Sequence, residues 1–222
     1  MSEQNREVNR RAFIARLGVA SASGLMILRG QPARAANDRI QVGIIGVGMR
    51  GRELAQRFTQ IGEATGACRV VAIADVWQRR VSEMKEKLQC DGYLDYREIL
   101  QRKDVDAVVV ATPDHWHGRM ALEAMAQGKD VYLEKPMCHT IEEARRVAEA
   151  ARAAGRIVQV GSQTTSADQW RKAKKVIADG MIGQMIMSQG SYHRNSVEGE
   201  WNWKIDPAAG PTGKGDDYID WK

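Results

Sequence analysis

An acid, a base and a proline follow one another where a short apolar run ends. Residues 131–133 are apolar, and Glu134, Lys135 and Pro136 come directly after them. Proline disfavours helical backbone at the preceding residue, so we expect Lys135 to stay extended. A lysine in such a place can give or take a proton at a reacting hydroxyl, and when charged it can stabilise an alkoxide. The pattern indicates proton-transfer chemistry at the end of a strand.

A glycine-rich turn indicates a second chemistry, the binding of phosphates. Gly46, Gly48 and Gly51 have the spacing G-x-G-x-x-G, after a predicted strand and at the start of a predicted helix. The first glycine permits the tight turn, the second lets the backbone approach a pyrophosphate, and the third lets helix and strand pack closely. The helix N-terminus offers free N–H groups to the phosphates. We therefore predict a dinucleotide site that includes Met49 and Arg50 of the same turn.

An acid at the end of the next predicted strand bears on which dinucleotide binds. Asp75 would accept hydrogen bonds from the adenosine ribose hydroxyls, which favours NAD, whereas a 2′-phosphate would meet its negative charge. Arg50, Arg79 and Arg80 lie near enough in sequence to leave NADP as an alternative. The alternative to a dinucleotide site is that the glycines form a purely structural turn in some other α/β protein.

Strands and helices alternate around these residues. Runs rich in Val and Ile predict five strands, at residues 39–45, 69–74, 107–110, 131–133 and 157–160. Helical patterns separate them, and the last of these helices begins with a capping box of Thr140 and Glu143 and stops at Gly155. This alternation predicts an α/β fold with a doubly wound, parallel Rossmann sheet buried on both faces. We assign residues 37–162 to this dinucleotide-binding domain.

The regular alternation of strands and helices ends after residue 162. A basic amphipathic helix is predicted over residues 168–179 and a strand over 185–190, and the rest is rich in Gly, Pro, Trp and Asp. We interpret residues 163–222 as the incomplete beginning of a second domain.

The first 36 residues have the three parts of an export signal. Arg10 and Arg11 form a twin-arginine pair, residues 17–28 are mildly apolar but shorter than the roughly 20 residues of a membrane span, and residues 33–35 are a small-x-small cleavage pattern. Residues 1–36 therefore resemble a Tat signal peptide, with an amphipathic helix as the alternative. Tat export predicts folding with the cofactor in the cytoplasm, contact with the Tat machinery, a periplasmic or otherwise exported product, and no stable membrane anchor after cleavage.

The charge distribution argues against nucleic-acid binding, and the cysteine content argues against a disulfide framework or a metal site. Six arginines and two glutamates in residues 1–36 account for +4 of the net charge of +5, so the body carries only +1. A nearly neutral body argues against nucleic-acid binding. The three cysteines have no paired spacing, so no disulfide framework or metal site is predicted.

Three motifs in order, at residues 46–51, 111–117 and 134–136, resemble the Gfo/Idh/MocA family of nicotinamide-dependent oxidoreductases. The resemblance covers roughly residues 38–222. It implies a Rossmann domain followed by an α/β domain whose open, largely antiparallel sheet holds a sugar-like substrate and often the contacts of a homo-oligomer.

The resemblance also implies roles for single residues. Lys135 would lie beside the nicotinamide and the substrate as the catalytic group, and Glu134 would help to hold the nicotinamide half of the cofactor. Thr112 and Pro113 would pass along the cofactor, and His117 would begin the next helix near the site. By the same likeness, Gln163 would approach the nicotinamide side.

The expected reaction is hydride transfer between a nicotinamide and a carbinol or keto carbon of a sugar, polyol or glycoside. Members of the family usually run well past 300 residues, so this chain, with 222, is expected to be truncated in the domain that completes the substrate site. Three alternatives stay open: an NAD-dependent glycosidase that oxidises its sugar transiently, a non-catalytic dinucleotide-binding protein, and a Rossmann-type methyltransferase. The last leaves residues 134–136 without a task.

Overall fold

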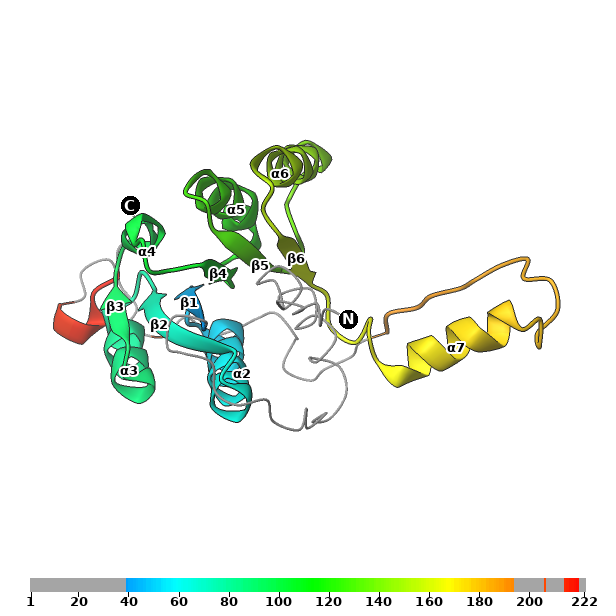
Figure 1. The fold of residues 1–222 in the computed structure, drawn as a ribbon, viewed down its shortest axis with the longest axis horizontal. Coiled ribbons are helices and arrows are strands. Elements are labelled where there is room, and N and C mark those ends of the chain that lie inside the picture. Colours follow the sequence, from blue (N-terminus) through cyan, green and yellow to red (C-terminus); the bar gives the residue numbers. More distant parts are fainter. Residues whose placement is uncertain (1–38, 194–205, 207–213, 220–222) are drawn as a thin grey trace, which may run out of the picture.

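A six-stranded parallel sheet forms the centre of the computed structural model, which describes residues 39–193, 206 and 214–219 (Figure 1). Its strands are β1 (Ile40–Ile45), β2 (Cys68–Ala74), β3 (Asp91–Tyr93), β4 (Ala107–Val110), β5 (Asp130–Glu134) and β6 (Val158–Gly161). Their order across the sheet is β3-β2-β1-β4-β5-β6, and every neighbouring pair is parallel. The order reverses between β1 and β4, and ligands bind at the carboxyl ends of the strands beside such a switch point.

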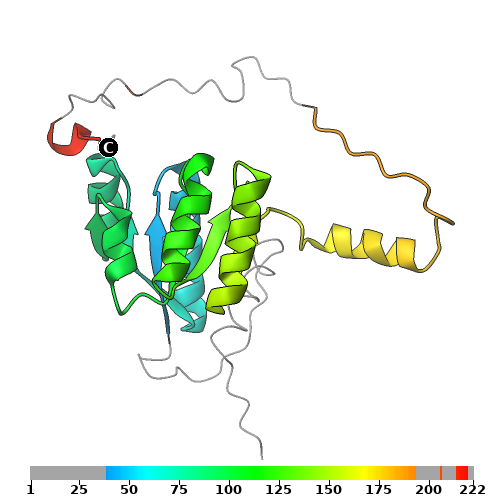
Figure 2. The same cartoon turned by 90° about the horizontal axis from the view of Figure 1, so that it is seen from above.

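Helices cover both faces of the sheet (Figures 1 and 2). One face carries α2 (Met49–Thr65) and α3 (Gln78–Leu88). The other carries α4 (Tyr96–Gln101), α5 (His117–Ala126) and α6 (Ile141–Ala154), with a short 3-10 helix, Asp114–Trp116, leading into α5. The predicted α/β Rossmann-type parallel sheet is confirmed.

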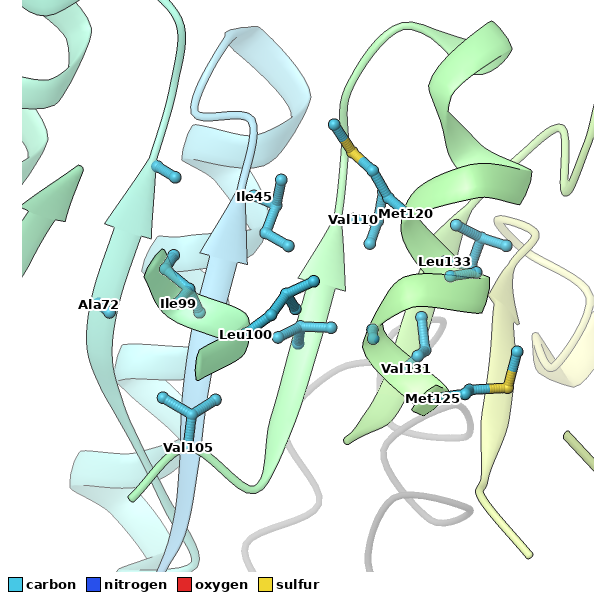
Figure 3. Packing of buried hydrophobic residues seen from close by; sticks show 14 of the residues in the cluster. Ile45, Ala72, Ile99, Leu100, Val105, Val110, Met120, Met125, Val131 and Leu133 are labelled. Carbon is cyan, nitrogen blue, oxygen red and sulfur yellow. The ribbon is translucent and has the colours of Figure 1, made fainter. Parts of the chain in front are cut away.

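Two apolar clusters hold these layers together. In the first, Leu54 and Phe58 of α2 and Met84 of α3 pack against β1 and β2. In the second, Ile99 of α4 and Met120 of α5 are buried in one cluster with side chains of β4 and β5 (Figure 3). Because the central strands are covered on both sides, their sequences are almost continuously apolar rather than alternating.

The helix ends follow the predicted capping chemistry. The Thr140 hydroxyl accepts a hydrogen bond from the Glu143 N–H, and the Glu143 carboxylate accepts one from the Thr140 N–H, both at 3.1 Å. Gly155 ends α6 with φ 59°, a backbone conformation that side chains with a Cβ rarely adopt. The capping box and this glycine stop are both confirmed.

One short strand and one short helix were not predicted. β3 has the sequence Asp-Gly-Tyr and lies at the edge of the sheet, where its three residues pair with Ala72–Ala74 of β2. Asp and Gly are depleted in strands, so β3 forms because it pairs with β2 and not because its own residues favour a strand. The helix α4 follows it, capped by the Asp95 carboxylate, which accepts from the Arg97 N–H.

Beyond the sheet, α7 (Asp168–Ala178) confirms the predicted basic helix, and it extends away from the sheet (Figure 2). The strand predicted over 185–190 is wrong: these residues form no strand and are exposed, with Ile186 at 94%. A strand needs a partner for its backbone N–H and C=O groups, and no described strand lies beside this segment.

The antiparallel sheet expected for a second domain is not present among the described residues, where the one antiparallel contact is an isolated bridge between Trp77 and Ile219. The predicted signal peptide, residues 1–36, lies outside the described residues, and the boundary near 162 stays a prediction. Within the described part of the chain, no helix combines the length and the hydropathy needed to cross a bilayer.

Candidate dinucleotide and catalytic site

The glycine turn is built so that a phosphate can approach its backbone. Gly46 has φ 83°, and a Cβ there would lie 2.9 Å from the Ala111 backbone. A Cβ on Gly51 would lie 1.8 Å from the Gly46 carbonyl oxygen, so only glycine lets α2 start this close to the strand end. At Gly48 a Cβ would meet only the guanidinium of Arg80, at 3.2 Å from its Nη1. The middle glycine therefore faces no part of the core.

The first turn of α2 offers its N-terminal N–H groups neither a side-chain cap nor an acidic residue of its own. Gly48 caps the helix without a side-chain hydrogen bond, and the first turn contains no acidic residue. Met49, which begins the helix, is 71% exposed. Uncapped N–H groups and the positive end of the dipole suit an anionic group, so this turn fits the pyrophosphate of a dinucleotide.

Asp75 lies at the end of β2 and supports the glycine turn directly. Its Oδ2 accepts a hydrogen bond from the Val47 N–H at 2.9 Å, and its Oδ1 accepts one from the Trp77 N–H at 3.0 Å. The side chain is buried, and Arg80 Nη1 lies 3.7 Å from Oδ2. The predicted ribose ligand thus also fixes the turn, a role that the sequence reading missed. Its carboxylate oxygens keep further lone pairs for ribose hydroxyls.

Glu134 is the residue on which most of the predicted site converges. Its Oε1 accepts from Arg50 Nε at 2.7 Å, and its Oε2 accepts from Gln163 Nε2 at 3.2 Å and from the Lys135 N–H at 3.1 Å. Its register partner on β6 is Gly161, where a Cβ would lie 3.0 Å from Oε1. One buried carboxylate therefore joins the turn of α2, the end of β5 and the segment after β6.

The hydrogen bonds of Arg50 keep its guanidinium charged. Burial would lower the pKa of Arg50, but the hydrogen bonds to Glu134 and Glu53 outweigh burial and raise the pKa above its usual value. The hydrogen bond from Arg50 also lowers the pKa of Glu53. The guanidinium is thus fully charged and is shared between two carboxylates.

Lys135 follows β5 directly and is exposed, with a cis peptide bond to Pro136. Its backbone is tied to Glu134 through the 3.1 Å hydrogen bond. The side chain therefore starts from a fixed point at the carboxyl edge of the sheet and remains open to a ligand.

His117 lies behind the turns that carry the predicted contacts. The ring is 2% exposed. Nδ1 is 2.7 Å from the Pro136 carbonyl oxygen and Nε2 is 2.9 Å from that of Thr112. The ring thereby joins the turn after β4 to the turn after β5. The predicted contact between this histidine and the cofactor stays a prediction.

Thr112 lies beside the glycine turn, and the predicted passage of Thr112 and Pro113 along the cofactor stays a prediction. The Thr112 methyl group would be 3.0 Å from a Cβ on Gly46, and its hydroxyl lies 3.6 Å from the Met120 sulfur. Pro113 is exposed and caps the 3-10 helix.

The structure therefore brings all the predicted residues to the carboxyl edge between β2 and β6. Among the described residues no group of three or more His, Cys, Asp or Glu side chains could hold a metal ion.

The sheet order, the glycine turn at the switch point and the acid at the end of β2 define a dinucleotide-binding Rossmann domain. Comparison with known proteins agrees: the "Oxidoreductase family, NAD-binding Rossmann fold", also called GFO_IDH_MocA, matches residues 40–162. The chain belongs to this family.

Several of the individual relatives are inositol dehydrogenases. An inositol 2-dehydrogenase from Klebsiella pneumoniae subsp. pneumoniae is 37% identical over 172 residues, which are 76% of this chain and 50% of the relative. A crystal structure of scyllo-inositol dehydrogenase from Lactobacillus casei with bound NAD(H) and scyllo-inositol has a TM-score of 0.60 at 25% identity, covering 65% of this chain and 42% of that one.

A 3-ketoreductase mutant from Actinomadura kijaniata, in complex with TDP-benzene and NADP, has a TM-score of 0.56 at 29% identity, covering 66% of this chain and 44% of that one. Similar structures thus hold either NAD(H) or NADP. The chain spans about half the length of the curated relatives that it matches.

Proposed function

We propose that the protein transfers a hydride between a nicotinamide cofactor and a carbinol or keto carbon of a sugar or polyol. The observation that carries the proposal is the buried Glu134 carboxylate, which holds Arg50 and Gln163 beside the exposed Lys135. The inositol dehydrogenases among its relatives support a polyol as the substrate class. When bound, the nicotinamide cofactor would accept or supply the hydride.

The chain's own residues would divide the remaining tasks. The N–H groups at the start of α2 would bind the pyrophosphate, and Asp75 would accept hydrogen bonds from ribose hydroxyls. Glu134 and Gln163 would line the nicotinamide side. Lys135 Nζ would hold or move the proton of the substrate hydroxyl, and in its charged form would stabilise the alkoxide oxygen.

Turnover by the purified protein tests this proposal. Incubation with NAD⁺ and myo-inositol, then with other cyclic and linear polyols, should accumulate NADH with at least one of them. Lys135→Met should lower kcat by about 100-fold or more, the usual size of general acid–base catalysis. Lys172→Met, which removes an exposed lysine of α7, is the matched control and should leave kcat unchanged.

Two outcomes would overturn the proposal. Cleavage of a glycoside without net NADH would assign the protein to the glycosidase alternative. Unchanged turnover in Lys135→Met would remove the lysine from the chemistry.

We further propose that residues 1–36 direct export by the Tat route after folding, and that the protein forms a homo-oligomer. The twin arginines and the cleavage pattern support the first proposal. Replacing Arg10 and Arg11 with Lys should keep the protein in the cytoplasm, as cell fractionation would reveal. Export of this variant at the normal level would contradict the Tat assignment.

A further inference from the structure

A segment near the end of the chain returns to the edge of the sheet and packs beside α3 (Figure 1). The Gln78 N–H donates to the Tyr218 carbonyl at 3.0 Å, and Ile219 forms an antiparallel bridge with Trp77. Ile219 is 7% exposed, so its side chain is buried against this surface. We call residues 214–219 the return segment. The return segment contacts Trp77, two residues after Asp75. The adenosine half of a dinucleotide would bind at Asp75, so the return segment lies close to that half of the site.

The return segment engages one of the arginines that could bind a 2′-phosphate. Asp217 Oδ1 accepts from Arg79 Nη2, and Asp206 Oδ2 lies 3.6 Å from Arg79 Nη1. The Arg79 guanidinium also lies 5.3 Å from the centroid of the Trp77 ring. Two carboxylates and an aromatic face therefore hold this side chain.

The other two candidate arginines also have carboxylate partners. Arg50 is shared between Glu53 and Glu134, both at 2.7 Å. Arg80 lies 3.7 Å from Asp75 and 4.9 Å from the centroid of the Trp77 ring. A dianionic 2′-phosphate would have to break one of these pairs and approach at least one carboxylate, and both steps cost free energy.

We propose that the return segment determines selectivity for NAD over NADP, with Asp217 as the specificity-determining residue because it keeps Arg79 from a 2′-phosphate. This inference rests on the proposed function, since it requires that a nicotinamide dinucleotide binds at the glycine turn. It does not depend on the substrate or on turnover.

The test is calorimetric titration of NAD⁺ and NADP⁺ into the purified protein and its Asp217→Asn variant. Asparagine keeps the size of the side chain and removes its charge, so it holds the Arg79 guanidinium less strongly against a competing phosphate, although Asp206 still lies 3.6 Å away. A hydrogen bond to a charged group is worth enough to tighten NADP⁺ binding by about tenfold. The NAD⁺ affinity should change by less than about twofold, because a ribose hydroxyl carries no charge.

The chain offers a matched control one residue away. Asp216 carries the same charge on the same segment, but its carboxylate contacts the Ser82 hydroxyl at 3.3 Å rather than Arg79. Asp216→Asn should tighten NADP⁺ binding by clearly less than Asp217→Asn, since it only weakens the surrounding field. An equal gain in both variants would overturn the role of Arg79.

Substitution of the arginine gives an independent test. Arg79→Gln alone should leave the NADP⁺ affinity unchanged, and the double variant Arg79→Gln with Asp217→Asn should lose the gain. A loss of NADP⁺ affinity in Arg79→Gln alone would mean that the guanidinium already binds the phosphate, and would overturn the inference. Failure of the unaltered protein to bind either dinucleotide would instead overturn the proposed function.

Discussion

Arg50, in the first turn of α2, donates a 2.7 Å hydrogen bond to Glu134, the last residue of β5, although 84 residues separate them in the chain. This pair connects the element that would hold the phosphates to the element that carries the proposed catalytic lysine. Since Glu134 is buried and also accepts from Gln163, it fixes the relative positions of three chain segments.

Removal of this carboxylate should destabilise the protein before any ligand is added. Glu134→Ala leaves the donors of Arg50 and Gln163 without their buried acceptor, and we expect a loss of about 1–3 kcal/mol in the free energy of unfolding. Urea unfolding of the cofactor-free protein measures it. Glu53→Ala removes the other partner of Arg50, but its side chain is 44% exposed, so the loss should stay below about 1 kcal/mol. Equal losses would contradict the central position of Glu134.

An added methyl group should reduce stability at one glycine of the turn and dinucleotide affinity at another. Gly51→Ala forces a Cβ to within 1.8 Å of a backbone oxygen, so we expect a loss of stability of about 1–3 kcal/mol. Gly48→Ala meets only a flexible arginine, so stability should change by about 0.5 kcal/mol or less while dinucleotide affinity falls.

Thermal unfolding and NAD⁺ titration separate these two effects. Gly190→Ala is the control, because a Cβ there has no neighbour within 4 Å. Full NAD⁺ affinity in Gly48→Ala would exclude close contact between this backbone and the pyrophosphate.

Loss of the His117 ring nitrogens should loosen both turns. His117→Phe keeps a buried ring but removes the ring N–H that a carbonyl oxygen of Thr112 or Pro136 accepts, at a cost of about 1–3 kcal/mol. The control is His139→Phe, since that ring is exposed and its contacts, an ion pair with Asp114 and an edge contact with the His115 ring, lie at the surface. Unchanged stability in His117→Phe together with lost NAD⁺ affinity would indicate that the ring contacts the cofactor itself.

The thiols of Cys68 and Cys90 should react slowly in the folded protein. Burial raises the pKa of each to about 11. A raised pKa means less thiolate at any given pH, so alkylation by iodoacetamide near pH 8 should be slow and should accelerate as the pH rises toward 11. Mass spectrometry of timed samples measures this, with the urea-unfolded chain as the control. Equal rates in the folded and unfolded chains at pH 8 would contradict this burial.

The sequence was most informative where a local pattern alone defines the element. The Val-rich strand Ala107–Val110 and the Thr140 capping box were predicted correctly because burial on both faces and helix capping leave direct traces in residue type. The edge strand Asp91–Tyr93 leaves none, because it exists only through its pairing with β2. The strand predicted over 185–190 failed for the converse reason, an apolar run without a described partner.

The same distinction applies to the site. The motifs identified the turn of residues 46–51 and the segment 134–136, since their residue types are needed for phosphate approach and for proton transfer. They did not reveal the pairing of Arg79 with Asp217, which are 138 residues apart, or the two hydrogen bonds that occupy Asp75. Such contacts depend on how the sheet brings distant segments together, which one sequence does not specify.

Binding of the dinucleotide to the purified protein tests the account most directly. Titration of NAD⁺ followed by calorimetry should show saturable one-to-one binding, and this binding should be weaker in the Gly48→Ala variant, whose fold is expected to be intact. A folded protein that binds neither NAD⁺ nor NADP⁺ would contradict the account.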